Sequence, residues 1–580
     1  MKDQVTSKIT GAHVLLEGLN EIGVDYIFAN LGTDHAPIIE ELAKWDRASR
    51  KRPPVIICPH ENVAVHMAGG YALATGRGQA VLVHVDAGTA NGAMAMHNLF
   101  RTRIPVLMMA GRAPYTMHGE MTGGRDTYVH FVQDPYDMAA IVRNFVRWEY
   151  TLPSGVVAKE VLRRAHAMMQ SDPPGPVYLA LPREMLAQTI DGESVQSYPE
   201  AKYGPVQAGG ISPEIADKIA AELMAAKNPI AVTAYLGRKP EAVAALDELA
   251  RECGIRVAEN FPVTVNIPHD SPCYAGLHSG ALLDGADLGL LLDIDVPWIP
   301  NDFPKSTSIR WIQIDIDPLK ADIPMWGFST DLRLQADNAI ALRQILAAVK
   351  KRADDAFRAR VKARIESWAP ANAARKKGLA EAAAKKDGAL TVEHVCATLN
   401  AKLSPDDILV NESVTNTHTV LAQFPRTKPG TYFAHGGGGL GGGGGMALGV
   451  KLAQPEKRVV QISGDGVFHF SNPDAVYAVA QQFKLPIFTV VLDNGGWRAV
   501  KASVLRVYPK GTASEEDEFQ ARLHSGRQGD ERHFEQVASA FGAHGESVAR
   551  AEDLPAAIDR CLAALKEGRA AVLTVKVTPL

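Results

Sequence analysis

Two short turns constrain this chain more than any other feature of its sequence. The turn Gly464-Asp465-Gly466 follows the largely apolar residues 459–462, and the turn Asp493-Asn494-Gly495-Gly496 follows the apolar residues 485–492. This pattern indicates a strand, a helix and a second strand of one parallel sheet, whose strands end at a common edge. Asp465 and Asn494 are therefore expected to lie close together there. Their oxygen atoms suit a hard cation such as Mg²⁺, which takes few protein ligands and is often bound through a phosphate as well.

Strand-like and helix-like segments alternate along most of the 580 residues. Such alternation predicts an α/β protein built from doubly wound parallel sheets. A polar, turn-rich segment at 191–210 and a segment rich in Ala, Lys, Arg and Glu at 350–386 interrupt the alternation. We therefore predict three α/β domains: an N-terminal domain over 1–190, a central domain over 205–349 and a C-terminal domain over 390–580. A helical linker over 350–389 joins the last two.

Composition narrows the class of protein. The formal charge is -4 with 22% charged residues, so no basic surface for nucleic acid is expected. No apolar run reaches the ~20 residues that cross a bilayer, and the first ten residues lack the apolar core of a signal peptide. The five cysteines are scattered, without a Cys-x-x-Cys pair. Such usage is typical of a reduced, cytoplasmic protein without a disulfide framework.

The two turns together resemble the cofactor motif of thiamine-diphosphate (ThDP) enzymes. The resemblance implies that Asp465, Asn494 and the backbone carbonyl of Gly496 bind Mg²⁺, with Gly464 and Gly466 among the cofactor-binding residues. Three departures from the family pattern are visible: Asp493 stands where the family usually has Asn, Val467 stands where many relatives have a phosphate-binding Ser, and the spacer is slightly longer. Without this resemblance, an ordinary strand-to-helix turn is the alternative interpretation.

Glu61 follows the predicted strand at 55–58 and begins a helix of small residues. From the residues alone, a Glu at a helix N-terminus is usually a favourable partner of the helix dipole. ThDP enzymes carry a Glu at this point. The resemblance implies that Glu61 binds the ring nitrogen N1′ of the cofactor's pyrimidine and promotes the proton transfer that activates the cofactor.

His84 ends the next predicted strand and is followed by Gly88-Thr89-Ala90-Asn91. This segment resembles benzoylformate decarboxylases, in which a His precedes a Gly-Thr-x-Asn turn, and Thr33 stands where those enzymes have an active-site Ser. The resemblance implies proton transfer or carboxylate binding by His84, and a structural His is the alternative. Weaker candidates on loops of the same domain are Asp34, His35, His118, His130 and Gln133.

Residues 436–445 are all glycine except Leu440. Glycine lets a backbone approach a ligand closely, but a flexible loop is the plain alternative. The resemblance implies that the Gly438 carbonyl binds the aminopyrimidine, that Leu440 supports the bent cofactor from below, and that Thr415 and Asn416 face the diphosphate. The family's following Leu-Pro-Ala-Ala is absent here, which leaves the rigidity of this backbone open.

The resemblance covers nearly the whole chain and implies a ThDP- and Mg²⁺-dependent lyase or transferase of the acetolactate synthase, benzoylformate decarboxylase and pyruvate decarboxylase group. Such an enzyme cleaves or forms a C–C bond next to a carbonyl, by decarboxylation of a 2-oxo acid with or without carboligation. In that group the active site lies between subunits, which implies a homodimer or homotetramer. The alternatives are a 2-hydroxy ketone lyase and a non-catalytic binding or regulatory subunit with the ThDP fold.

Substrate and second cofactor are less constrained. The active-site His that benzoylformate decarboxylases carry in the central domain falls at about Ser271, and either His269 or His278 could substitute. Acetolactate synthases bind FAD at an Arg-containing turn after a central-domain strand; here residues 293–298 read Asp-Ile-Asp-Val-Pro-Trp, so we expect no tight FAD site. The charged segment 510–532 is either a solvated excursion or an active-site lid.

Overall fold

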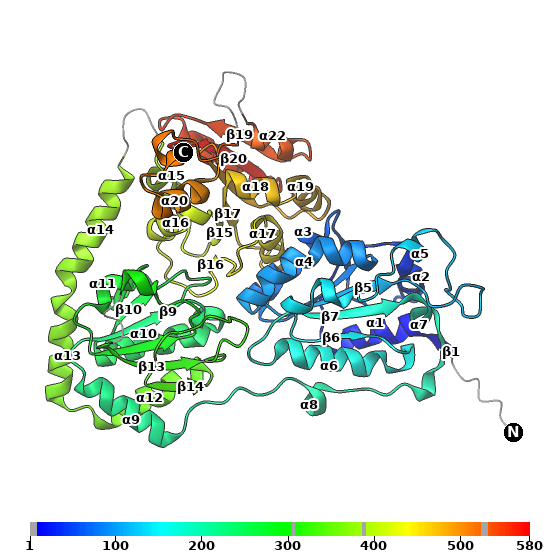
Figure 1. Ribbon diagram of the computed structural model, residues 1–580, viewed down its shortest axis with the longest axis horizontal. Coiled ribbons are helices and arrows are strands. Elements are labelled where there is room, and N and C mark those ends of the chain that lie inside the picture. Colours follow the sequence, from blue (N-terminus) through cyan, green and yellow to red (C-terminus); the bar gives the residue numbers. More distant parts are fainter. Residues whose placement is uncertain (1–7, 304–307, 385–389, 524–531, 580) are drawn as a thin grey trace.

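The computed structural model describes residues 8–303, 308–384, 390–523 and 532–579. Within these residues the chain forms three six-stranded sheets, one in each of three domains, and one two-stranded sheet. In Figure 1 the N-terminal domain is blue and cyan, the central domain is green, and the C-terminal domain runs from yellow to red. All pairings inside the three large sheets are parallel, which confirms the predicted α/β fold class.

The N-terminal sheet has the strand order β3-β2-β4-β5-β7-β6. Successive residues of its strands face opposite layers: Val81 and Val83 of β4 pack with α3 and α4, whereas Ala80 and Leu82 pack with α1 and α6. This double coverage explains why these strands read as continuous apolar runs. The main elements are α1 (Gly11–Glu21), β2 (Ile27–Asn30), α2 (Ala36–Arg47), β3 (Val55–Ile57), α3 (Glu61–Thr75), β4 (Gln79–Val83), α4 (Val85–Thr102), β5 (Val106–Arg112), β6 (Glu149–Thr151), α6 (Ala158–Gln170), β7 (Val177–Pro182) and α7 (Arg183–Ala187).

The central sheet has the order β11-β10-β9-β12-β13-β14, so the strand order reverses between β9 and β12. In chain order this is 3-2-1-4-5-6, the arrangement of many dinucleotide-binding domains. The elements are α9 (Pro213–Ala225), β9 (Pro229–Thr233), α10 (Pro240–Cys253), β10 (Arg256–Glu259), β11 (Tyr274–Gly276), α11 (Gly280–Leu283), β12 (Leu288–Leu292), β13 (Arg310–Asp315), β14 (Leu332–Gln335) and α12 (Asn338–Arg352).

The C-terminal sheet has the order β16-β15-β17-β18-β20-β19. Counted within each domain, this order is the same as that of the N-terminal sheet, with reversal points at β2/β4 and at β15/β17. Ligands of open α/β sheets bind at such points. The elements are α15 (Val392–Asn400), β15 (Ile408–Glu412), α16 (Thr417–Gln423), β16 (Tyr432–Phe433), α17 (Gly443–Ala453), β17 (Val459–Gly464), α18 (Asp465–Phe470), α19 (Pro473–Gln482), β18 (Phe488–Asp493), α20 (Arg498–Val507), α21 (Thr512–Glu515), α22 (Phe534–Ser539), β19 (His544–Val548), α23 (Leu554–Lys566) and β20 (Ala571–Lys576).

The N-terminal and C-terminal domains share one hydrophobic core where α3 crosses α17, seen side by side in Figure 1. Glycines make this close crossing possible: a Cβ on Gly70 would lie 2.1 Å from the Met446 carbonyl oxygen, and a Cβ on Gly449 would lie 2.0 Å from that of Met67. The second half of the glycine-rich segment therefore belongs to a packed helix. A flexible loop, one of the two interpretations of that segment, is wrong for these residues.

The domains are joined by extended and helical segments. Helices α13 (Asp355–Ser367) and α14 (Ala369–Ala383) follow the central domain, and α14 runs toward the C-terminal domain in Figure 1. Residues 385–389 of the predicted linker lie outside the described residues. An antiparallel pair, β1 (Lys8–Thr10) with β8 (Thr189–Asp191), ties the two ends of the N-terminal domain together. Among the described helices, none combines the length and apolar character needed to cross a bilayer.

Candidate active site

The two turns of the C-terminal sheet meet as predicted. Asp465 is the first residue of α18 after β17, and the 493–496 turn follows the neighbouring strand β18. The Gly495 amide donates to Oδ2 of Asp465 at 3.0 Å, and the Gly496 amide donates to Oδ1 of Asn494 at 3.1 Å. Both side chains are buried, at 3% and 6% exposure. The turn thus gathers carboxylate, amide and carbonyl oxygens at one edge of the sheet.

The charge at this edge is unusual. Burial raises the pKa of Asp465 to about 6, and the neighbouring Asp493 carboxylate acts in the same direction. Nη2 of Arg532 donates to Oδ2 of Asp465 at 3.3 Å and also, at closer range, to Oδ1 of Asp493. Gly464 precedes this helix, and Gly466 faces the Trp497 ring, which a Cβ would meet at 2.4 Å.

The glycine-rich segment up to the start of α17 is held by hydrogen bonds to side chains. The carboxylate of Glu412, at the end of β15, accepts the amides of Gly441 at 2.6 Å and Gly443 at 2.6 Å. Asn98 of α4 accepts the Gly439 amide at 3.1 Å and donates to the Gly439 carbonyl at 2.9 Å. These bonds anchor the segment to both domains, so its backbone is ordered without the proline that the family pattern carries.

The predicted cofactor contacts of this segment are available. Gly438 is exposed, and a Cβ there would meet nothing within 4 Å. Leu440 is half-buried between the anchors. Gly441 has φ +95°, and its Cβ would lie 2.2 Å from the Phe470 carbonyl oxygen, so this position requires glycine.

Glu412 and its neighbour His435 form a buried charged pair with Nε2 to Oε1 at 3.1 Å. Burial alone would raise the pKa of Glu412, but His435 and the backbone amides of the glycine segment hold it below its usual range. Conversely, burial lowers the pKa of His435, and the Glu412 carboxylate more than offsets this and raises it. The anchor is therefore a carboxylate that accepts backbone amides and pairs with His435.

The turn predicted to face the diphosphate follows Glu412 directly. Val414 has φ +50°, which a β-branched residue rarely adopts and which often marks a functional turn. Thr415 is exposed and Asn416 is buried just before α16. The exposed His278 lies beside this turn, with its ring centroid 4.3 Å from that of His418.

Glu61 is the first residue of α3 and is 5% exposed. Its Oε1 accepts from the side-chain amide of Asn30 at 2.9 Å, and its Oε2 accepts from that of Asn91 at 3.1 Å. The next residue, Asn62, donates to the Gly441 carbonyl at 3.3 Å and to Oδ1 of Asn472 at 3.0 Å. The N-terminus of α3 thus abuts the glycine-rich segment across the domain boundary.

His84 lies at the end of β4 and bonds two side chains. Its Nδ1 is paired with Oδ1 of Asp34, and its Nε2 lies 3.0 Å from Oε1 of Gln133. The bond to Asp34 raises the pKa of His84, although partial burial opposes it. Burial would raise the pKa of Asp34, but His84 and then His35 lower it.

The other candidate residues of this domain differ in exposure and position. Thr33 is exposed, with its Oγ1 3.5 Å from Nε2 of the buried His130. His118 is exposed on a loop. Gly88–Asn91 lies in the first turns of α4, so the predicted Gly-Thr-x-Asn turn is in fact helical. Helical geometry carries Asn91 back over the N-terminal turn of α4, where it reaches Glu61.

The central-domain alternatives also divide. Ser271 is buried and donates to Oδ1 of Asp247 at 2.5 Å. His269 is 6% exposed, with its Nε2 2.8 Å from Oε2 of Glu259 and its ring stacked on Tyr274. Both are structural residues. Only His278, of the residues considered, lies beside the C-terminal domain's turn.

Reasoning from the sequence did not identify the residues that hydrogen-bond the candidate site residues and the glycine-rich segment. They are Asn30, Asn91, Asn98, Glu412 and Arg532. Most of them act across long sequence separations, which local patterns do not reveal. Asn91 was visible in the Gly-Thr-x-Asn segment, and Glu412 in the segment before Thr415. Arg532 follows residues 524–531 of the charged segment, which lie outside the described residues, so the lid hypothesis stays a prediction.

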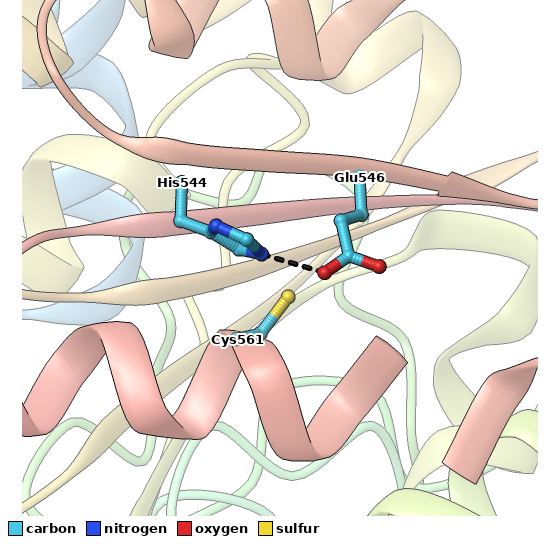
Figure 2. A group of neighbouring side chains, drawn as sticks. All are labelled: His544, Glu546 and Cys561. Atoms are coloured by element: carbon cyan, nitrogen blue, oxygen red, sulfur yellow. Dashed lines mark hydrogen bonds and ion pairs between the residues drawn. The ribbon is translucent and has the colours of Figure 1, made fainter. Parts of the chain in front are cut away.

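A second group of ligand-type side chains lies on the edge strand β19 and on α23 (Figure 2). Nε2 of His544 is 2.6 Å from Oε1 of Glu546, and Arg560 binds both oxygens of that carboxylate, at 2.8 and 2.6 Å. Burial raises the pKa of Cys561 to about 12. With its carboxylate neutralised by Arg560 and its thiol protonated, the group joins a helix to a strand and lacks the free anionic ligands of a metal centre.

Family models match both domains that carry the predicted motifs. They are described as the N-terminal and the C-terminal TPP binding domain of thiamine pyrophosphate enzymes, and they cover residues 9–141 and 413–575. The chain belongs to the thiamine pyrophosphate enzyme family. Thiamine pyrophosphate is the same compound as thiamine diphosphate, so the predicted family and organic cofactor are confirmed.

Individual relatives of this ThDP enzyme agree. A benzoylformate decarboxylase of Pseudomonas aeruginosa is 26% identical over 85% of this chain and 87% of its own length. An acetolactate synthase of Mycobacterium bovis is 26% identical over 96% of this chain and 86% of its own. Among solved structures, the fold matches a ThDP-dependent 4-hydroxybenzoylformate decarboxylase of Rhodococcus jostii RHA1 with a TM-score of 0.76 at 20% identity, covering 99% of this chain and 100% of that one.

Proposed function

We propose that this ThDP enzyme uses Mg²⁺ and decarboxylates a 2-oxo acid, with or without transfer of the product to an acceptor carbonyl. The observation that carries the proposal is Glu61, a buried carboxylate held by two amide donors at the start of α3. A non-catalytic relative has no use for such a preorganised carboxylate, so its retention speaks against a purely regulatory subunit.

The residues present fit Mg²⁺ and a diphosphate. Asp465, Asn494 and the carbonyl of Gly496 are the hard oxygen donors that Mg²⁺ prefers, with positions left for phosphate oxygens. Thr415 is exposed at the strained turn, and Gly438 offers an unobstructed backbone. We assign Asp465, Asn494 and Gly496 to the metal and the other two to the cofactor, together with Asn416, Leu440, Gly464 and Gly466.

When bound, ThDP supplies the electron sink that lets a 2-oxo acid lose CO₂. Glu61 would hold and move the proton at the pyrimidine ring nitrogen. Asn30 and Asn91 fix its carboxylate with one donor on each oxygen, and each oxygen keeps a further acceptor site. The carboxylate therefore needs no reorientation when the cofactor binds.

His84 would act on the substrate. Asp34 occupies Nδ1, so Nε2 would have to exchange its contact with Gln133 for the substrate in order to bind the carboxylate of a 2-oxo acid or return a proton to the product carbon. The raised pKa keeps the imidazolium populated nearer to neutral pH. Thr33 and His278 are the proposed additional substrate contacts: both are exposed, Thr33 follows β2 of the N-terminal domain, and the His278 ring lies 4.3 Å from that of His418 in the C-terminal domain.

Carboligation is a second candidate. The match to the acetolactate synthase spans 96% of this chain, against 85% for the benzoylformate decarboxylase. Purified protein with ThDP and Mg²⁺ would be incubated with pyruvate or benzoylformate, with and without an aldehyde. CO₂ release alone identifies a decarboxylase, and a 2-hydroxy ketone product identifies a carboligase. Cleavage of added 2-hydroxy ketones would identify a lyase, and failure to turn over any of these substrates or to bind ThDP would refute the proposal.

We further propose that the central domain binds no tight FAD, despite its strand order. At the carboxyl edge of its sheet, Nζ of the buried Lys320 lies 2.8 Å from Asp315 and 3.0 Å from Asp295. Arg103, from the N-terminal domain, binds both oxygens of Asp295, at 2.8 and 3.0 Å. This ionic network would have to be dismantled for a flavin to enter. Flavin absorbance of the purified protein would contradict the proposal.

A homodimer or homotetramer is also proposed. Within one chain, Asn62 beside Glu61 already donates to the Gly441 carbonyl at 3.3 Å, so the placement of the active site between subunits stays a prediction. The loop after β5 exposes large side chains, among them Tyr128 at 80% and Met117 at 56% exposure, as interfaces do. Sedimentation analysis tests this assembly. The five cysteines are free and buried, which supports the proposed cytoplasmic location, where thiols remain reduced.

A further inference from the structure

Arg532 lies beside the turn at 493–496, which we propose binds Mg²⁺. It precedes α22, yet its guanidinium reaches the edge of the sheet, where Nη2 donates to Asp465 at 3.3 Å and to Asp493 at closer range. Its side chain is only 14% exposed and packs over the Phe534 ring at 5.2 Å. A long cationic side chain that is nearly buried needs specific partners.

The bonds to Asp465 and Asp493 offset part of the free-energy cost of burying the Arg532 charge. Asp493 replaces the uncharged Asn that the family usually has at this position, so this turn carries one more negative charge than the family pattern. Two carboxylates in one buried site repel each other, and both Asp465 and Asp493 are buried here. The positive charge of Arg532 offsets the negative charge of Asp493. The net charge of the site is then that of one carboxylate, Asp465.

Two donors of the same guanidinium have no acceptor. Nε and Nη1 of Arg532 are buried, and no described residue bonds them. Buried donors are nearly always paired in native proteins, so an unpaired pair beside a ligand site indicates a missing acceptor. Guanidinium groups match the oxygens of a phosphate especially well.

A phosphate contact is also missing on the other side of the motif. Val467, two residues after Asp465, is buried and has no hydroxyl. Many ThDP enzymes have a phosphate-binding Ser at this position. The site therefore combines one lost phosphate donor with two unused ones.

We propose that Arg532 is a diphosphate-binding residue of this enzyme: Nη2 stays on Asp493, while Nε or Nη1 binds an oxygen of the cofactor's diphosphate in place of the lost hydroxyl. Asp493 acts as the positioning residue that holds the guanidinium. This inference rests on the proposed use of ThDP with Mg²⁺.

Calorimetric titration of the full-length protein tests it, with ThDP and with inorganic pyrophosphate, each at saturating Mg²⁺. Loss of a charge-assisted hydrogen bond predicts that Arg532→Gln weakens both ligands by roughly 10- to 100-fold. Arg532→Lys should recover only part of the affinity, because a point charge cannot reproduce the two-donor geometry. Arg522→Gln is the matched control: this side chain is 61% exposed and pairs with Asp517, and the variant should bind like the wild type.

The double variant Asp493→Asn/Arg532→Gln separates binding from mere neutralisation. If Arg532 contacts the diphosphate, the double variant stays as weak as Arg532→Gln. If Arg532 only neutralises Asp493, removing both charges restores wild-type affinity and overturns the inference, as does unchanged binding in Arg532→Gln itself. A wild-type protein that binds no ThDP refutes the proposed function instead. Circular dichroism of each variant verifies that it is folded.

Discussion

Nδ1 of His84 is bonded to the fully buried carboxylate of Asp34, so one imidazole nitrogen is committed and the other faces Gln133. This arrangement fixes the orientation of the ring, and the bond to Asp34 raises the pKa of His84.

Replacing Asp34 by Asn removes the group that raises the pKa of His84. The imidazolium of the variant should deprotonate at a lower pH, because the adjacent carboxylate that stabilises the charged ring is gone. NMR titration of the His84 ring measures the shift, and any limb of the pH–rate profile that reports His84 should move with it. Asp355→Asn, on an exposed residue of α13, is the control and should move neither.

The same pair predicts a pH dependence of stability. The pKa of Asp34 lies below its ordinary 3.8, so its contribution is present above that value and is lost as pH falls through the lowered pKa. The pKa of His84 lies above its ordinary 6.5, so its contribution is present below that value and is lost as pH rises through the raised pKa. The destabilisation by Asp34→Asn should therefore be greatest near about pH 5. Urea unfolding that gives the same difference near pH 5 and in alkaline solution would contradict this.

Glu61→Gln should leave the cofactor bound but slow its activation. The amide keeps the size of the side chain and cannot perform the proton transfer, and loss of a general acid–base group costs roughly 10²- to 10⁴-fold in rate. Exchange of the thiazolium C2 proton, followed by NMR, reads this step directly, with calorimetric ThDP affinity as the control. Exchange at the wild-type rate would show that Glu61 has another role.

Gly441→Ala should destabilise the protein, because the position combines φ +95° with a Cβ that would overlap the Phe470 carbonyl oxygen. We expect a loss of roughly 1–3 kcal/mol in the free energy of unfolding. Gly438→Ala is the matched control within the same segment, since its Cβ would enter open space, and its stability should stay near that of the wild type. Equal effects in both variants would show that the segment is not held as described.

Glu412→Gln should loosen the glycine-rich segment. The charged acceptor of the Gly441 and Gly443 amides is lost and the charge of His435 is left unbalanced, which costs roughly 1.5–3 kcal/mol. Urea unfolding measures the loss, and hydrogen exchange of the glycine amides should accelerate. Glu366→Gln, on an exposed side chain of α13, serves as the comparison and should change neither quantity.

Much of the fold, and the meeting of the two motif turns, could be predicted from the sequence. The strands before the two turns were predicted from the apolar residues 459–462 and 485–492, and the structure has them at Val459–Gly464 and Phe488–Asp493, because each is a buried run that ends at a turn. The meeting of Asp465 with the Asn494 turn followed from the common edge of parallel strands alone.

The remaining features depend on contacts that local patterns do not encode. Gly443–Ala453 forms a helix although glycine disfavours helices, since close packing against α3 outweighs intrinsic propensity. The pairs Asp34–His84 and Asp493–Arg532 join residues 50 and 39 positions apart, and Glu412 is identified as an anchor only by the amides it accepts.

The crossing of α3 and α17 has a consequence for how this enzyme can be altered. The N-termini of both helices belong to the candidate site, and the glycines that seat them leave no tolerance for an added methyl group. A larger residue at Gly70 or Gly449 would wedge the two domains apart and displace Glu61 relative to the glycine-rich segment, although neither position touches a ligand. The two cofactor-binding domains therefore behave as one mechanical unit, and remodelling one of them for a new substrate must preserve the crossing.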